Sequence, residues 1–170
     1  GYQIEVLPGV YTLTASGGGL SAPIVHRDIV VGVDNVKVDF VGSSQPNERP
    51  SVDLNGAYYA GSDYSTSFNR STGPVSIVSA GLTVTDSNDD KLVSATVTIS
   101  NLLDPGAEIV AVDSGGTNIS AVFDQYAGVL RLTGSDTVAN YQQVLRTLSY
   151  YNGATRPTGT SRSVEVTVND

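Results

Sequence analysis

One stretch, residues 82–101, constrains the fold more than any other part of the chain. It reads LTVTDSNDDKLVSATVTISN, with apolar residues at alternate positions on both sides of an acidic centre. This alternation predicts two β-strands that each bury one face. Residues 86–90 then form the loop between the strands. Alternate residues of such a loop aim carboxylate and amide oxygens at one point, and Ca²⁺ takes about 6 to 8 oxygen ligands in irregular geometry.

The same acidic centre is equally typical of a solvated β-turn, in which Asp and Asn side chains bond to their own backbone. An EF-hand is excluded, because the sixth position counted from Asp86 is Lys91 instead of glycine, and the twelfth is Val97 instead of glutamate. The residues therefore leave two interpretations open, a calcium loop and a plain turn.

Composition excludes several classes of function. The chain has 170 residues, no cysteine, one histidine (His26) and a net charge of −8. Without cysteine there is no disulfide framework and no thiol nucleophile, and a single histidine argues against zinc sites and most nucleophilic catalysis. The acidic balance, with no Lys/Arg cluster, argues against nucleic acid. We therefore expect a protein that is not an enzyme.

The rest of the composition favours an exported protein. Only 15% of residues are charged, and Gly, Ser, Thr and Val are abundant, as in secreted β-rich repeat proteins. No apolar run approaches the roughly 18 to 20 residues of a membrane span, and the first residues lack a signal core. We expect an internal piece of a longer protein that is secreted or held at the cell surface.

Residues 1–42 predict strands at 2–7, 10–15, 24–31 and 36–41, separated by turns such as Pro8-Gly9 and Asp34-Asn35. The words LPGVYTLTASGGGL and NVKVDF resemble the second half of carboxypeptidase-regulatory-like or Cna-B-type domains, which are small prealbumin-like β-sandwiches. Residues 43–50 have the proline and polar content of a linker. The predicted organisation is thus a partial module at 1–42, a linker at 43–50 and a second domain at 51–170.

Residues 51–170 predict an all-β domain. A lead-in strand starts near Ser51, and strands at regular spacing follow at 75–79, 82–85, 92–100, 108–113, 119–123, 129–133, 148–151 and 163–169. This spacing favours a Greek-key β-sandwich. Residues 135–146 break the rhythm, because their apolar positions share a helical face, and Ser135 or Asp136 is the expected N-cap.

The order of words in residues 51–170 resembles the cadherin-like repeats of large bacterial surface proteins, which are related to chondroitin-sulfate-proteoglycan-type repeats. The matching words are SVDLNG, LTVTDSNDDKLVSATVTISN, AGVLRLTGSDTVANYQQVLRTLSYYN and SVEVTVND. The resemblance implies a cadherin- or immunoglobulin-like sandwich strung in tandem, with neighbouring repeats and cell-surface proteins or glycans as partners. It implies adhesion or spacing as the function.

The resemblance also implies ion ligands. In cadherins an Asp-x-Asp loop and an acidic motif after the last strand hold calcium between domains. By position, Asp86 and Asn88 match the loop with Asp90 as a helper, and Asn169 and Asp170 match the start of the closing motif. An ion would then join Asp86 and Asn88 to the acidic tail of a neighbouring repeat. Two departures weaken the site: Asn88 is a neutral amide, and Arg70 falls where a glutamate is common.

A second function remains open, a carbohydrate-binding module. Tyr58, Tyr59 and Tyr64 lie in a polar, irregular segment, and exposed aromatic rings stack on sugars. Because no tryptophan supports them, the sequence favours packing of these rings against strands or loops.

Overall fold

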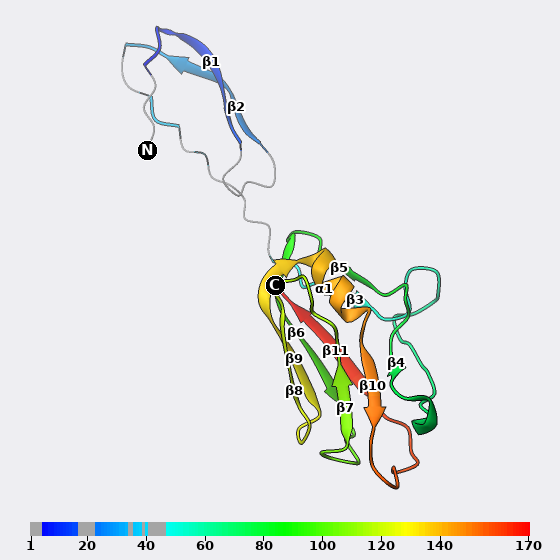
Figure 1. Cartoon of the computed structure of the whole chain (residues 1–170). Helices are drawn as coiled ribbons and strands as arrows, with labels where there is room; N and C mark the ends of the chain where they lie inside the picture. Colours follow the sequence, from blue (N-terminus) through cyan, green and yellow to red (C-terminus); the bar gives the residue numbers. More distant parts are fainter. Residues whose placement is uncertain (1–4, 17–22, 34–35, 39, 41–46) are drawn as a thin grey trace. The chain divides into compact units, whose positions relative to one another are not determined.

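Two compact units make up the chain, Gly1–Pro46 and Asn47–Asp170, here called unit 1 and unit 2. The structure is a computed structural model, and it describes residues 5–16, 23–33, 36–38, 40 and 47–170. The division lies inside the stretch 43–50 that the sequence predicts to be a linker. Figure 1 shows the whole chain.

Unit 1 contains one antiparallel hairpin, β1 (Gly9–Ala15) and β2 (Ile24–Val31), with a register shift between Tyr11 and Leu13. The described residues of the strands expected at 2–7 and 36–41 are not in strands, so that expectation is wrong for residues 5–7, 36–38 and 40. The remaining residues of those two strands and the Asp34-Asn35 turn lie outside the described residues. A two-stranded hairpin by itself is marginal in water.

Unit 2 is mostly β, and its strands follow the alternating runs of the sequence. They are β3 (Ser51–Asp53), β4 (Val75–Ser76), β5 (Thr83–Thr85), β6 (Lys91–Ile99), β7 (Glu108–Ala111), β8 (Ser120–Asp124), β9 (Val129–Thr137), β10 (Ser149–Asn152) and β11 (Val164–Asn169). A short 3₁₀ turn, η1 (Arg70–Thr72), precedes β4. The strands form antiparallel sheets with the orders β11-β6-β9-β8, β4-β10-β7 and β3-β5.

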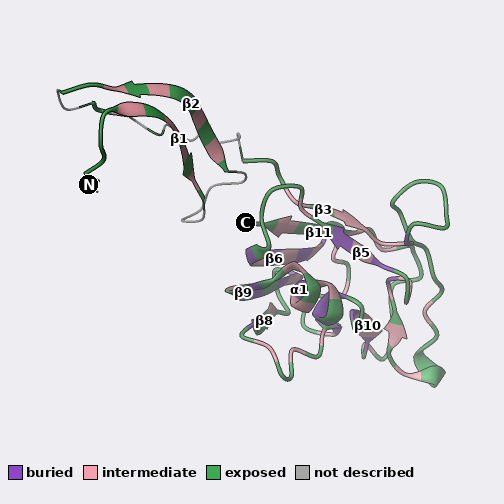
Figure 2. Ribbon diagram, turned by 90° about the horizontal axis from the view of Figure 1, so that it is seen from above, coloured by how far each residue is buried: buried purple, intermediate pink, exposed green. Residues whose placement is uncertain are grey.

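The core of unit 2 lies between the two larger sheets, as the buried segments in Figure 2 indicate. Strand β6 supplies Leu92, Ala95, Val97 and Ile99, all buried. The sequence alternation places Val93 in this set, but Val93 is exposed. A register shift between Leu92 and Ser94 explains the difference, because a β-bulge moves the following side chains to the other face.

The helix expected at residues 135–146 is shorter than predicted. Strand β9 continues to Thr137, and α1 (Val138–Leu145) follows, with Thr137 as the N-cap that accepts the Asn140 N–H. The expected caps Ser135 and Asp136 belong to the strand instead. Within the described residues, no helix has the length and apolarity that crossing a membrane requires.

Candidate metal centre

The loop between β5 and β6 is held by the first of its acidic residues. Asp86 follows β5 directly, and its Oδ1 accepts hydrogen bonds from the backbone N–H of Asn88 at 3.0 Å and of Asp89 at 3.1 Å. Asp favours such turns because its short side chain reaches the backbone two or three residues on. The turn uses one oxygen of Asp86, and the other, Oδ2, remains for a different partner.

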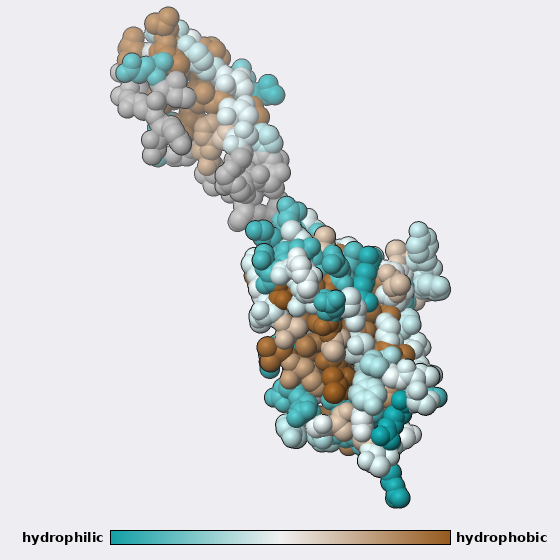
Figure 3. All heavy atoms as spheres, viewed as in Figure 1, coloured by the Kyte–Doolittle hydropathy of each residue, from teal (hydrophilic) through white to brown (hydrophobic). Residues whose placement is uncertain are grey.

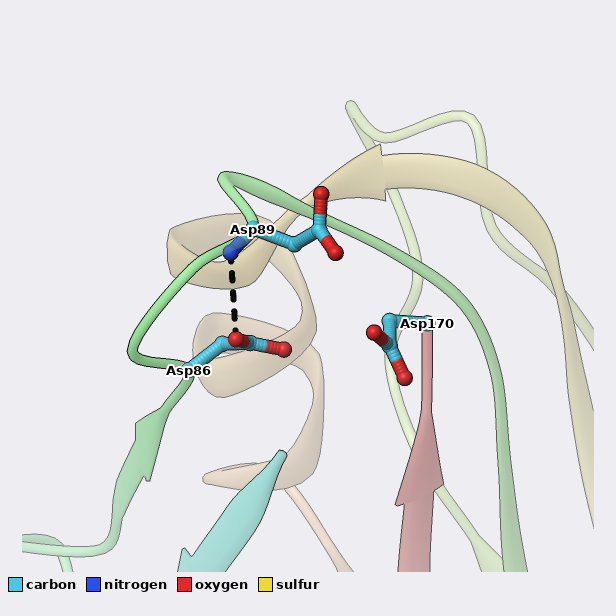
Figure 4. Close-up of side chains that lie close together, drawn as sticks. All are labelled: Asp86, Asp89 and Asp170. Atoms are coloured by element: carbon cyan, nitrogen blue, oxygen red, sulfur yellow. Dashed lines mark hydrogen bonds between the residues drawn. The ribbon is translucent and has the colours of Figure 1, made fainter. Parts of the chain in front are cut away.

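Three carboxylates meet beside this turn, although they come from two distant parts of the sequence. Asp86 and Asp89 lie in the loop, and Asp170 follows β11, which pairs with β6. One carboxylate oxygen from each lies within 4.8 Å of the others. Figure 4 shows the three side chains around one shared space. We call Asp86, Asp89 and Asp170 the acidic cluster.

Carboxylate oxygens of the acidic cluster lack hydrogen-bond donors, and the carboxylates repel one another. Oδ2 of Asp86 and Oδ2 of Asp170 are shielded from solvent and have no hydrogen-bond partner among the described residues. A buried, unpaired carboxylate oxygen is unfavourable because it has lost its water. The pKa of the Asp89 carboxyl is raised from 3.8, first by loss of hydration and then by Asp170, with smaller effects of Asp86 and Asp90. A proton or a cation would relieve this repulsion.

The structure brings together only some of the residues proposed as ligands from the sequence. Asp86 and Asp170 are in the cluster, whereas Asn88, Asp90 and Asn169 are not among its carboxylates. Asp90 is exposed, and its backbone carbonyl accepts the N–H of Val138. Asn169 lies in β11 opposite Ser94 and points its amide at the Asp170 carbonyl.

Asp89 is the member of the cluster that sequence reasoning did not select. The Asp-x-Asp pattern assigned ligands to alternate residues, 86, 88 and 90. The turn changes this spacing. The Asp89 N–H donates to Asp86 Oδ1, and the Asp89 side chain then lies beside that of Asp86. The signal in the sequence was an Asp three residues after a turn-forming Asp.

Asn88 ties the loop to the beginning of unit 2. Its Oδ1 accepts the Glu48 N–H at 3.2 Å, and its Nδ2 donates to Asn47 Oδ1 at 3.2 Å. The acidic loop thus contacts both the first residues of unit 2 and, through the cluster, Asp170. The chain enters and leaves unit 2 at the same end.

Arg70, whose positive charge we expect to oppose calcium binding, lies away from the acidic cluster. Arg70 begins η1, and its guanidinium donates to the carbonyl of Thr155, in the connection from β10 to β11. This connection precedes β11, whereas Asp170 follows it, so Arg70 belongs to the opposite end of unit 2 (Figure 1).

That opposite end holds a second group of charged residues, which the sequence gave no reason to expect. Glu108 is fully buried, and Arg162 Nε donates to both of its carboxylate oxygens, at 3.0 and 2.8 Å. Arg162 Nη2 also pairs with Asp104 at 2.8 Å. Tyr150 donates its hydroxyl to Glu108 at 2.7 Å. We call Asp104, Glu108 and Arg162 the arginine network.

Every carboxylate in the arginine network has donors. Asp104 accepts from Asn152, from Thr158 and from Arg162, and these bonds hold its pKa below 3.8, the Asn152 amide being the largest cause. Burial alone would raise the pKa of Glu108, but the bonds from Arg162 and Tyr150 outweigh it and lower the pKa from 4.5. This network fastens the β6–β7 and β10–β11 connections to each other.

The tyrosines of the irregular segment after β3 do not pack as expected. Tyr58 is 99% exposed and Tyr59 is 71% exposed. The preferred sequence interpretation, packing against strands or loops, is therefore wrong for these two rings. Tyr64 lies farther along and lines a recess of about 810 Å³ together with Phe68 and Tyr150.

No protein-family model matches the chain, and searches of curated proteins and of solved structures also give no match.

Proposed function

We propose that unit 2 is a calcium-binding, cadherin-like β-sandwich repeat with a structural or adhesive role in a secreted or cell-surface protein. The observation that carries this proposal is the acidic cluster, in which two solvent-shielded carboxylate oxygens lack any donor among the described residues. Calcium fits the cluster by chemistry. It prefers carboxylate and carbonyl oxygens, and its 2.3–2.6 Å bonds place opposite ligands about 4.6–5.2 Å apart.

The strand connections support the Greek-key part of the proposal. After β6, the chain passes to the other large sheet for β7, returns for the β8–β9 hairpin, and passes again to β10 before ending in β11. In the seven-stranded immunoglobulin arrangement the last strand lies in the same sheet as the strand that precedes it in the chain. Here the preceding strand is β10, but β11 pairs with β6 in the other large sheet. This departure carries Asp170 to the acidic loop.

The place of the cluster supports a role at domain junctions. An ion held by Asp86, Asp89 and Asp170 would fix the end of β11 to the loop that already binds Asn47 and Glu48. The resemblance implies that a neighbouring repeat supplies the tail carboxylate, whereas in this geometry the tail of the same repeat supplies it. Water or a neighbouring unit would complete the 6 to 8 ligands.

Isothermal titration of the chelator-treated protein with Ca²⁺, followed by thermal melts, tests this proposal. We expect one site per chain and a raised melting temperature with Ca²⁺. At a free Ca²⁺ concentration 100 times the dissociation constant, the stabilisation would be about 2.7 kcal/mol. Asp86→Asn should abolish most of this gain while keeping an oxygen for the turn.

Asp63→Asn is the matched control, because Asp63 is an exposed carboxylate outside the cluster. It should leave the calcium effect unchanged. Absence of heat and of any thermal shift in the wild-type protein would leave residues 86–90 as a plain turn and would reject the calcium function.

The exposure of Tyr58 and Tyr59 favours a second candidate, carbohydrate binding by the loop after β3. The loop is well held: Asp53 Oδ1 accepts the N–H groups of Asn55 and Gly56, and the Leu54 N–H bonds to the Ser62 carbonyl. A panel of neutral oligosaccharides, with tyrosine fluorescence as the readout, distinguishes this function from a spacer without a sugar ligand.

A further inference from the structure

A recess opens into unit 2 where two strands that each end a large sheet, β4 and β11, come to the same side. It is the recess of about 810 Å³ that Tyr64 lines. Residues 64–70 and residues 157–162 of the β10–β11 connection line it together with strands of both sheets. Pockets for small ligands have volumes of about 300–1,000 Å³, so the recess is large enough for a small organic molecule.

The recess leaves part of the apolar core uncovered. Half-buried apolar side chains that pack against the core line it, and we call them the floor: Leu54, Phe68, Val75, Ile77, Val164 and Val166. Five of these side chains are aliphatic. Apolar groups that remain in contact with water forgo the stabilisation that burial brings. A ligand with an apolar body therefore gains free energy when it covers the floor.

The charge of the recess is opposite to that of the whole chain. The chain has 17 Asp and Glu residues, but the lining of the recess contains none of them and includes Arg70 and Arg162. Arg162 is neutralised by Asp104 and Glu108. Arg70 takes part in none of the ion pairs found among the described residues, and its guanidinium donates to the Thr155 carbonyl. An anionic group is therefore the complement of Arg70.

Residues 64–67, next to Arg70 in the lining, offer hydrogen-bonding groups that have no partner. Tyr64, Ser65, Thr66 and Ser67 are exposed, and no hydrogen bond joins them to any other part of the described chain. In Figure 3 the side of unit 2 around β4 and the β10–β11 connection is largely pale or teal. A ligand in the recess thus meets polar groups at the surface and the apolar floor below them.

We propose that the recess binds a small amphipathic carboxylate, an aliphatic or aromatic carboxylic acid. Its apolar body covers the floor, and its carboxylate pairs with Arg70, whose planar N–H fork matches a carboxylate. The hydroxyls of residues 65–67 are the additional donors. A neutral sugar would leave the charge of Arg70 unpaired, and a strongly hydrated anion would leave the aliphatic side chains uncovered.

Titration of the isotope-labelled full chain with butanoate, hexanoate and octanoate, followed by NMR with chelator present, tests the proposal. The amide signals that shift should belong to residues 64–70, 157–162 and β11. The dissociation constant should fall about two- to fourfold for each added CH₂, because each buried CH₂ contributes favourably. Octanol, which has the same chain without the charge, should bind at least tenfold more weakly than octanoate.

Arg70→Glu should weaken octanoate binding tenfold or more, whereas Arg70→Lys should retain part of it. Arg131→Glu is the matched control, because Arg131 is an exposed arginine on β9 outside the lining, and it should change nothing. Octanoate shifts confined to other residues, an affinity independent of chain length, or an unchanged affinity of Arg70→Glu overturn the proposal. Tighter binding of oligogalacturonate or of a hexaglutamate peptide than of octanoate also overturns it. None of these results depends on calcium binding.

Discussion

The two ends of unit 2 both gather carboxylates, but they neutralise them in different ways. At the far end, Arg162 and a set of neutral donors satisfy Asp104 and Glu108 completely. At the end where unit 2 begins, Asp86, Asp89 and Asp170 take part in none of the ion pairs found among the described residues. Strand β6 runs from one group to the other.

Under the proposed calcium function, the difference separates a structural role from a ligand-dependent one. The arginine network fastens two connections permanently, because its positive charge is part of the fold. In our proposal, the acidic cluster fastens β11 to the acidic loop only when a bound cation removes its repulsion. A module of this kind would keep its far end fixed, and the end with the acidic cluster would respond to the surrounding cations.

The largest effect should come from removing the cation of the arginine network. Arg162→Leu leaves the fully buried Glu108 without its ionic partner, and Arg162 itself is only 8% exposed. Removing one partner of a buried pair costs about 3–5 kcal/mol. We expect a loss of that size in the free energy of unfolding, measured by urea denaturation with chelator present.

Arg156→Leu serves as the control, because Arg156 is an exposed arginine in the same β10–β11 connection. Its effect should stay within about 0.5 kcal/mol, as for most surface substitutions. Equal losses for the two variants would mean that the network has no special share in stability.

The contrast between the two ends also shows what the sequence could predict. The strand–loop–strand at residues 82–101 has a local pattern, and the structure has strands β5 and β6 there. The resemblance pointed to Asp86 and Asp170, but not to Asp89, since the turn geometry that selects it depends on one hydrogen bond. The bulge that exposes Val93 likewise has no local signature.

The arginine network was beyond prediction for a different reason. Glu108 and Arg162 are 54 positions apart, and neither belongs to a motif. They meet because the β6–β7 connection, which ends at Glu108, lies against the β10–β11 connection, which contains Arg162. Only the three-dimensional topology brings these two connections together. The exposure of Tyr58 and Tyr59 could not be predicted for the opposite reason. A ring that packs against no other residue leaves no periodic pattern in the sequence.

A smaller effect, of opposite sign at the two ends, should follow from removing one negative charge. In chelator, Asp170→Asn relieves repulsion in the acidic cluster and should raise the melting temperature by about 2–4 °C, while Asp104→Asn should lower it by a similar amount. In excess Ca²⁺, Asp170→Asn should instead be less stable than the wild type. Thermal melts in both buffers give the comparison, and an acidic cluster that is stabilising without calcium would contradict it.

The smallest effect concerns the pH at which the charges of Asp89 and Asp104 stop affecting the free energy of unfolding. The pKa of Asp89 is raised in the folded state, so its charge costs stability above that pKa, and the cost vanishes as pH falls through the raised value toward 3.8. The pKa of Asp104 is lowered, so its charge adds stability above 3.8, and this is lost only as pH falls through the lowered value. In chelator, the stability difference between wild type and Asp89→Asn should therefore disappear at a higher pH than the difference between wild type and Asp104→Asn. Urea unfolding between pH 7 and pH 3 measures both differences, and the reverse order would mean that the cluster carries no net repulsion.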